Sequence, residues 1–250
     1  AVRAGYEQVE RLAAASFATP GLFLERLVTR ARHVEVQLFG DGAGRVLALG
    51  ARDCSLQRRH QKVVEETPPP GLAPAVLDQL LATATDLGTS VGYRSAGTVE
   101  FVHDVERDEV AFLEVNTRLQ VEHPVTEAVH GVDLVEWMVR LAGGDASMFD
   151  EPAPRSTGHA IEVRVYAEDP HRGHRPGAGV LTEAAFAPGP RVDTWVEAGT
   201  EVSAHYDPLL AKVITHAPDR DAARRAMVDA LHATRLSGIE TNAAYVAALL

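Results

Sequence analysis

The chain has 250 residues, of which 46% are hydrophobic and 24% charged, a composition typical of a globular protein with one large or two modest domains. Its formal net charge of −11 argues against nucleic acid as a partner, because phosphate binding depends on clustered lysine and arginine. A cytoplasmic protein without membrane contact is expected, since no apolar run reaches a membrane span, the first residues lack an export signal and the single Cys54 excludes an intrachain disulfide.

The first part of the chain predicts a helix, a short strand and a hairpin. Helical spacing of apolar residues predicts a helix over residues 6–16, which Thr19-Pro20-Gly21 ends. The apolar run over residues 22–28 predicts a short strand. Two alternating segments, residues 33–39 and 45–49, flank the turn residues Gly40-Asp41-Gly42 and predict a β-hairpin.

Residues 52–66 combine Arg, His, Gln and Lys side chains, and the basic cluster 58–62 stands out in an acidic chain. Such a set suits an anionic ligand, although the residues alone fit a solvated basic loop equally well. Thr67 and the prolines at 68–70 then interrupt the chain. An apolar stripe over residues 74–87 predicts a helix that buries one side and ends at Gly88.

A second hairpin is predicted around residue 107, where it joins residues 97–103 to an extended segment over residues 112–122. Centring its turn on Arg107 places Glu100 directly opposite Glu114. Like charges in such a position destabilise a sheet, whereas Mg²⁺ prefers oxygen ligands and is usually held by one or two carboxylates. With Asn116 two residues further along, the pair predicts a site for a hard dication.

If this segment stays extended as far as residue 122, alternation places five polar side chains on one face, namely Glu114, Asn116, Arg118, Gln120 and Glu122. An ordinary half-solvated strand is the alternative interpretation. Pro124 then ends the extended structure. The neighbouring His123 fits a packed structural histidine at least as well as a chemical role.

The remaining sequence predicts two helices, a domain boundary and a strand-rich part. The helices cover residues 125–130 and 134–142, and Asp133 is a good N-cap for the second. Residues 143–157 are rich in Gly, Pro, Ser and acidic residues and form the best boundary. Beyond it we expect strands at 159–167, 180–186, 192–196 and 209–215, a helix from Pro218 or Asp219 to about Thr234 followed by Gly238, and a last helix from Asn242. The expected fold class is α+β.

Three long motifs resemble one known family. EVNTRLQVEHPVTE at 114–127, RDCSLQRRHQKVVEE at 52–66 and RHVEVQLFGDG at 32–42 strongly resemble the biotin carboxylases, an ATP-grasp family. Within it, GVLTE at 179–183 and RVDTWVEAGTEVSAHYDPLLAKVI at 191–214 look most like the urea carboxylases. The resemblance implies part of an ATP-grasp domain over residues 1–146, an antiparallel sheet with helices, and a biotin carboxylase C-terminal domain over residues 158–250.

The resemblance also implies an activity, the carboxylation of biotin with ATP, bicarbonate and Mg²⁺ or Mn²⁺. It implies nucleotide contacts at Glu25, Leu27, His33, Gln57 and His60, bicarbonate contacts at Lys62, Arg118, Gln120 and Val121, and metal ligands at Glu100, Glu114 and Asn116. Glu122 is implied as the base that takes the bicarbonate proton, and Arg164 as the cation that faces the biotin ring. Without the family, Glu25 and Arg164 fit ordinary surface residues.

The family further implies partners, namely a biotin carboxyl carrier domain and a carboxyltransferase domain, and it allows a homodimer. Its glycine-rich lid loop, N-terminal subdomain and biotinylated lysine are expected outside these 250 residues, so the chain alone is expected to show no appreciable bicarbonate-dependent ATPase activity. Two alternatives stay open. One is the biotin carboxylase subunit of an acyl-CoA carboxylase, which shares these residues, and the other is a non-catalytic truncated remnant.

Overall fold

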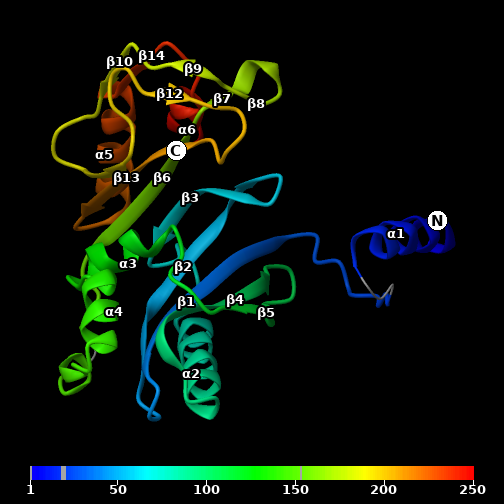
Figure 1. Ribbon diagram of the computed structural model, residues 1–250. Coiled ribbons are helices and arrows are strands. Elements are labelled where there is room, and N and C mark those ends of the chain that lie inside the picture. Colours follow the sequence, from blue (N-terminus) through cyan, green and yellow to red (C-terminus); the bar gives the residue numbers. More distant parts are fainter. Residues whose placement is uncertain (1, 18–20, 153) are drawn as a thin grey trace. The chain divides into compact units, whose positions relative to one another are not determined.

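The computed structural model describes residues 2–17, 21–152 and 154–250, which belong to two units, residues 1–30 and residues 31–250 (Figure 1). In the first unit, helix α1 (Val2–Ser16) confirms the predicted helix and begins earlier. The turn expected at Thr19 and Pro20 lies outside the described residues. The strand predicted over residues 22–28 is wrong, because the described part of this unit offers no neighbouring strand to pair with its backbone.

The second unit is built on one eight-stranded antiparallel sheet with the order β11-β13-β6-β3-β2-β1-β4-β5. Its strands are β1 (Ala31–Asp41), β2 (Val46–Arg58), β3 (Gln61–Thr67), β4 (Arg94–Asp104), β5 (Glu109–Asn116), β6 (His159–Tyr166), β11 (Arg191–Thr194) and β13 (Leu209–Ala217). The hairpins predicted for β1 with β2 and for β4 with β5 are confirmed. Pairing of β3 with β6 joins strands before residue 146 and after residue 158 in a single sheet.

Three two-stranded ribbons accompany the sheet. They are β7 (Glu168–Asp169) with β8 (Arg175–Pro176), β9 (Gly179–Val180) with β12 (Glu201–Val202), and β10 (Glu183–Ala185) with β14 (Arg235–Ser237). The single strand predicted over residues 180–186 is therefore wrong, since β9 and β10 belong to different ribbons. The strands predicted at 159–167, 192–196 and 209–215 are confirmed as β6, β11 and β13.

The helices of this unit are α2 (Pro74–Ser90), α3 (His123–His130), α4 (Leu134–Ala142), α5 (Arg220–Ala233) and α6 (Ala243–Leu249), with short 3₁₀ turns η1 (Ser147–Phe149) and η2 (Pro170–Arg172). The predicted cap at Asp133 is confirmed, because its side chain accepts a hydrogen bond from a backbone N–H at 2.8 Å. Asp219, one of the two residues expected to open the later helix, caps α5 with a bond of the same length. The α+β fold class is confirmed as well. In the described part of the chain, no helix combines the length and the apolar composition needed to cross a bilayer.

Gly88 lies inside α2 and does not end it, contrary to the prediction. It is buried, and a Cβ atom placed there would come within 3.1 Å of Val46 and 3.2 Å of Leu38. The glycine therefore allows close packing of the helix on the sheet, and the helix continues to Ser90.

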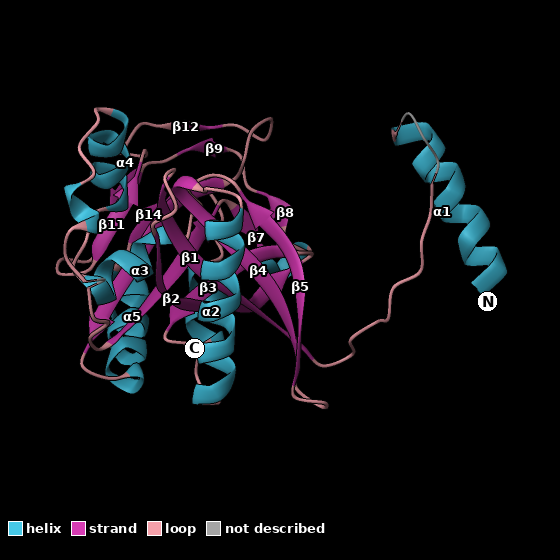
Figure 2. Cartoon of the chain, turned by 90° about the horizontal axis from the view of Figure 1, so that it is seen from below, coloured by secondary structure: helices cyan, strands magenta, loops and turns pink. Residues whose placement is uncertain are grey.

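Alternation along β1 separates an apolar from a polar face of the sheet. Val34, Val36 and Leu38 pack with α2, which together with α5 covers one face (Figure 2). Glu35 and Gln37 point to the opposite face, and both are fully buried. Polar side chains from several strands gather on this second face.

The extended segment predicted over residues 112–122 is wrong beyond Asn116, where β5 ends. The chain leaves the sheet because the side chain of Gln120 turns inward to Arg52 and Glu100, and α3 begins at His123. Strand alternation therefore does not explain how the side chains of residues 118–122 are placed. The helix predicted from residue 125 is confirmed and begins two residues earlier.

Candidate active site

Arg52 is the centre of a buried polar cluster on the face opposite α2. Its side chain is fully buried, and all five N–H donors have partners. Nε donates to Glu35 at 2.7 Å, and the two terminal nitrogens donate to Gln37, Thr126, Thr98 and Gln120 at 2.7 to 3.2 Å. One guanidinium thus ties together β1, β4, the loop after β5 and α3.

Lys62 lies beside this cluster, among three carboxylates. Its Nζ atom lies 2.6 Å from Glu35, 3.2 Å from Glu100 and 2.5 Å from Glu122. Burial alone would lower the pKa of Lys62, but the charges of Glu35 and Glu122 raise it well above its ordinary value. The side chain is therefore a cation whose three donors are all directed at anions.

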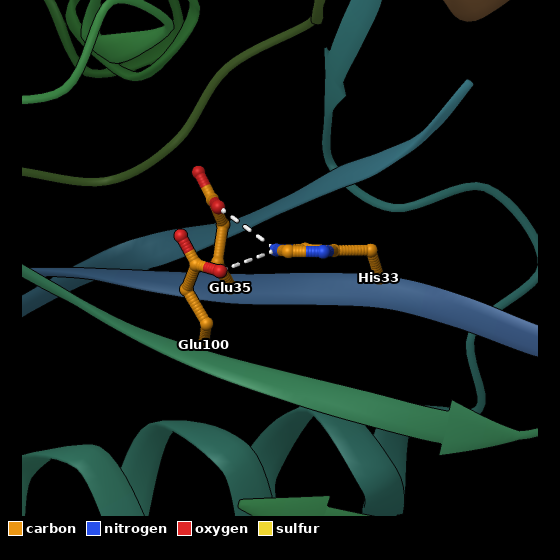
Figure 3. Close-up of side chains that lie close together, drawn as sticks. All are labelled: His33, Glu35 and Glu100. Carbon is orange, nitrogen blue, oxygen red and sulfur yellow. Dashed lines mark ion pairs between the residues drawn. The ribbon is translucent and has the colours of Figure 1, made fainter. Parts of the chain in front are cut away.

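His33 points one ring nitrogen at two of the same carboxylates, as Figure 3 shows. Its Nε2 atom is 2.9 Å from Glu100 and 3.4 Å from Glu35. Burial opposes protonation, yet the contacts with both carboxylates raise the pKa of His33 to about 9. Burial likewise opposes ionisation of Glu100, but His33 and Lys62 lower its pKa to about 2. Both groups are charged at neutral pH.

Glu100 and Glu114 are paired directly across β4 and β5, as the sequence predicts. The side-chain amide of Asn116 lies 3.0 Å from Glu100 and 3.1 Å from Glu114, so the two carboxylates approach it from one side. Rotation of that amide by half a turn would present its oxygen instead of its nitrogen. Two carboxylates and an amide oxygen fit a hard dication such as Mg²⁺ or Mn²⁺.

Glu122 lies between Lys62 and a second cation, Arg164. It is 2% exposed and is the residue immediately before α3. Arg164 Nη2 donates to Glu122 at 3.0 Å, while its Nε donates to Glu65 at 2.6 Å. Burial alone would lower the pKa of Arg164, but Glu65 and Glu122 raise it above its ordinary value. A carboxylate flanked by two fixed cations can exchange a proton where negative charge is stabilised.

The structure gathers some of the other predicted site residues at this cluster. Gln120 uses both ends of its amide, for Glu100 and for Arg52, and Gln57 contacts His33 Nδ1 at 3.2 Å. The carbonyl of Val121 accepts a hydrogen bond from Lys212 at 3.2 Å. These contacts place Gln57, Gln120 and Val121 at or next to the buried cluster.

Other predicted residues lie outside the buried cluster. Arg118 is exposed and contacts the Asn116 amide oxygen at 3.5 Å. His60 is exposed at the tip of the β2–β3 turn, with a φ angle of 65°. Glu25 and Leu27 belong to the unit of residues 1–30, and their contact with adenine stays a prediction. His123 forms a hydrogen bond of 2.7 Å between its ring and the Gln120 carbonyl, which fits its structural interpretation.

Several residues of the cluster were not predicted from the sequence, namely Glu35, Gln37, Arg52, Glu65, Thr126 and Glu162. The sequence does contain one sign of them, namely polar residues that interrupt the apolar pattern of β1 and β6. A polar side chain on a buried strand needs a hydrogen-bond or ion-pair partner. The partners come from distant segments, and the spacing of the sequence does not show them.

Comparisons with known proteins show the family to which the chain belongs. A family model described as the carbamoyl-phosphate synthase L chain, ATP binding domain, matches residues 1–147, and one described as the biotin carboxylase C-terminal domain matches residues 162–250. The chain is 50% identical over 245 residues to the urea amidolyase of Saccharomyces cerevisiae, covering 98% of this chain and 13% of that protein. It is 46% identical over 236 residues to the mitochondrial methylcrotonoyl-CoA carboxylase subunit alpha of Arabidopsis thaliana, covering 93% of this chain and 32% of that protein.

Two solved structures extend the comparison. The urea carboxylase of Kluyveromyces lactis is 48% identical with a TM-score of 0.86, over 98% of this chain and 21% of that one. The biotin carboxylase domain dimer of the Hydrogenobacter thermophilus 2-oxoglutarate carboxylase, solved with MgADP, ADP and bicarbonate, is 39% identical with a TM-score of 0.90, over 97% of this chain and 53% of that one. This chain thus spans only a fraction of the length of these relatives. By its sequence and its fold, it belongs to the biotin carboxylases of the ATP-grasp family.

Proposed function

We propose that this chain is the biotin carboxylase portion of a longer, biotin-dependent carboxylase, in which ATP and bicarbonate are used to carboxylate biotin. The observation that carries the proposal is the position of Glu122, which is 2.5 Å from Lys62 and 3.0 Å from Arg164. A base that takes a proton from bicarbonate needs a cation for the anion it produces and, next to it, a cation for the biotin enolate. Lys62 and Arg164 are these two cations, and both form ion pairs with Glu122.

Proton transfer to Glu122 also explains how these cations become available. Lys62 directs its three donors at three carboxylates, so a bicarbonate anion reaches it only in exchange for one of them. A proton on Glu122 removes the negative charge that holds both Lys62 and Arg164. Lys62 can then donate to the phosphorylated bicarbonate, and Arg164 can donate to the biotin enolate. Arg118, at the exposed side, is proposed to bind the bicarbonate together with Gln120 and the Val121 amide.

The nucleotide and the metal are proposed to bind beside this centre. Glu100, Glu114 and Asn116 would hold Mg²⁺ or Mn²⁺, and the ion would supply positive charge that neutralises the phosphates of ATP. Nucleotide contacts are proposed for Glu25, Leu27, His33, Gln57 and His60. The division of the chain into residues 1–146 and 158–250 is proposed to separate the nucleotide and metal ligands from the domain that supplies Arg164.

Urea is the proposed final carboxyl acceptor. The similarity to urea amidolyase and urea carboxylase supports it, and an acyl-CoA is the alternative because methylcrotonoyl-CoA carboxylase is nearly as similar. A biotin carboxyl carrier domain and a carboxyltransferase domain are the proposed partners within the longer protein, with a homodimer as a further assembly. A cytoplasmic location is proposed, and the single cysteine, buried and unpaired, fits it.

The full-length protein that contains this chain tests the proposal. ADP release with Mg²⁺ and ATP should depend on bicarbonate, and carboxylation of free biotin should accompany it. The acceptor is then identified by measuring whether label from bicarbonate is incorporated into product when urea, or when methylcrotonoyl-CoA, is added. Absence of bicarbonate-dependent ADP release would contradict the proposed activity, and fixation only with the acyl-CoA would contradict urea as the acceptor.

A further inference from the structure

Two buried acidic side chains, Glu65 and Glu162, lie near Arg164, and the reaction proposed above does not use them. Glu65 of β3 and Glu162 of β6 are directly paired across antiparallel strands, and both are fully buried. Directly opposed residues in such a pair have Cβ atoms about 4.5 to 5.5 Å apart and point to the same face. The two carboxyl groups therefore share one enclosed space.

Their oxygen atoms are mostly unpartnered. Glu65 Oε1 accepts from Arg164, while Glu65 Oε2 and both carboxyl oxygens of Glu162 have no hydrogen-bond partner among the described residues. Two ionised carboxylates side by side in a dry interior are strongly unfavourable, and one proton between them removes a charge and supplies a donor. Burial and the neighbouring Glu65 raise the pKa of Glu162 well above its ordinary value. Burial, partly offset by Arg164, raises the pKa of Glu65 to about 7.

We propose that Glu65 and Glu162 share one proton and act as a positioning pair for Arg164, an inference that rests on the role of Arg164 in the function proposed above. Arg164 is held by its Nε atom at Glu65 and presents Nη2 to Glu122. Its carbonyl also accepts a hydrogen bond of 3.0 Å from Asn242. Glu65 thus holds the guanidinium through a contact that does not involve Glu122.

The shared proton has a specific consequence for the charge of the site. When Glu122 is protonated, Glu65 is the remaining acidic partner of Arg164, and it keeps the guanidinium in place for the biotin enolate. A second full charge on Glu162 would neutralise Arg164 further and weaken its attraction for that enolate. A single negative charge on the pair orients Arg164 and leaves it available to the substrate.

Kinetics of Glu65→Gln in the full-length protein test the positioning role, with Glu66→Gln as the matched control. Glu66 is the next residue on β3, points to the other face and binds His159 and Arg220. For Glu65→Gln we expect kcat/KM for free biotin to fall about tenfold or more, as for a lost charge-assisted hydrogen bond, with bicarbonate-dependent ATP cleavage in the absence of biotin changed less than about twofold. Glu66→Gln should leave both rates unchanged.

The same variants separate positioning from a purely structural role. Glutamine keeps an acceptor for Arg164 but removes one charge of a buried ion pair, so the kinetics are compared at a temperature at which the thermal midpoint shows that Glu65→Gln is folded. An equal loss of ATP cleavage and biotin carboxylation together with a lower midpoint would overturn the proposal, and so would unchanged kinetics. Inactivity of the unmodified protein would instead contradict the proposed function, which keeps the two failures distinct.

Infrared difference spectroscopy tests the shared proton directly. Spectra of the full-length protein minus a variant with both Glu65→Gln and Glu162→Gln should contain the C=O stretch of a protonated, buried carboxylic acid at neutral pH. The corresponding difference for Glu66→Gln should lack this acid band, because the pKa of Glu66 is lowered by its bonds to His159 and Arg220 in spite of burial. Absence of the acid band from the double-variant spectrum would show that the pair carries no proton.

Discussion

Glu100 and Glu114 face one another across β4 and β5 only because Leu113 is an extra residue in the ladder. Near the turn, Asp104 pairs with Glu109 and Phe101 with Phe112, a register that would place Glu100 opposite Leu113. The irregularity between residues 100 and 101 shifts the pairing by one residue, and both carboxylates then point to the same face. A local insertion in an edge strand thus creates the arrangement on which metal binding depends.

Glu114→Gln should weaken binding of the divalent cation. The substitution keeps the shape and one oxygen ligand but removes half of the carboxylate charge that opposes the metal. We expect the dissociation constant for Mn²⁺, measured by water-proton relaxation in the full-length protein with ADP, to rise by about tenfold or more. Glu106→Gln, in the exposed turn of the same hairpin, is the control and should bind Mn²⁺ normally. Unchanged affinity in Glu114→Gln would place the metal elsewhere.

The sequence predicts the pairing of Glu100 with Glu114 for a partly accidental reason. Counting from a turn centred on Arg107 gives the right partner, although the turn lies half a residue earlier and the bulge at Leu113 compensates for the difference. Local patterns also predict most helices and their caps correctly. They fail for residues 117–122, where a tertiary contact of Gln120 with Arg52 outweighs strand alternation.

The buried acid pair is beyond the reach of such patterns. Glu65 and Glu162 meet because β3 pairs with β6 in the middle of the sheet, although 97 residues separate them. Nothing in the local sequence specifies which two distant strands become neighbours. The same holds for Arg52, whose partners extend from Glu35 to Thr126.

Replacing Arg52 with Met should destabilise the chain strongly. The variant leaves Glu35 buried without its main guanidinium partner and leaves the side chains of Gln37 and Thr98 without a donor. Removing one member of a buried ion pair costs about 3–5 kcal/mol, which urea denaturation of the chain would measure. Arg45→Met, at a half-exposed pair with Asp41, should cost much less than Arg52→Met, because solvent screens an exposed ion pair. Similar losses in the two variants would contradict the central role of Arg52.

The stability of the chain should depend on pH through Glu65. Its pKa rises from an ordinary 4.5 to about 7 in the folded protein, where Arg164, Glu122, Lys62 and Glu162 surround it. The folded state therefore binds this proton more tightly than the unfolded chain does. The stability that the proton contributes is present below pH 4.5 and is lost as the pH rises through about 7, at about 1.4 kcal/mol for each unit of pKa difference.

Urea denaturation between about pH 5 and pH 8 checks this dependence. Glu65→Gln cannot titrate, so its unfolding free energy should fall less over this range than that of the unmodified chain. Glu66→Gln is the control, because the pKa of Glu66 is lowered and the group is ionised throughout the range. Parallel pH profiles for the unmodified chain and Glu65→Gln would show that Glu65 does not hold the proton.

Glu122→Gln in the full-length protein should abolish most bicarbonate-dependent turnover while ATP binding survives. Glutamine keeps the size and one acceptor oxygen, for Lys62 or for Arg164, but cannot take a proton, and loss of a general base typically costs about 10²–10⁴-fold in rate. Arg118→Ala should differ in kind, because it weakens bicarbonate binding at the exposed side and uncouples ATP cleavage from biotin carboxylation. Steady-state rates of ADP release and of carboxybiotin formation, compared over a range of bicarbonate concentrations, distinguish the two variants.

The control Glu136→Gln, exposed on α4, should behave as the unmodified protein. If Glu122→Gln mainly lost ATP binding or unfolded, Glu122 would be a structural partner of its two cations, and the base would have to be sought elsewhere.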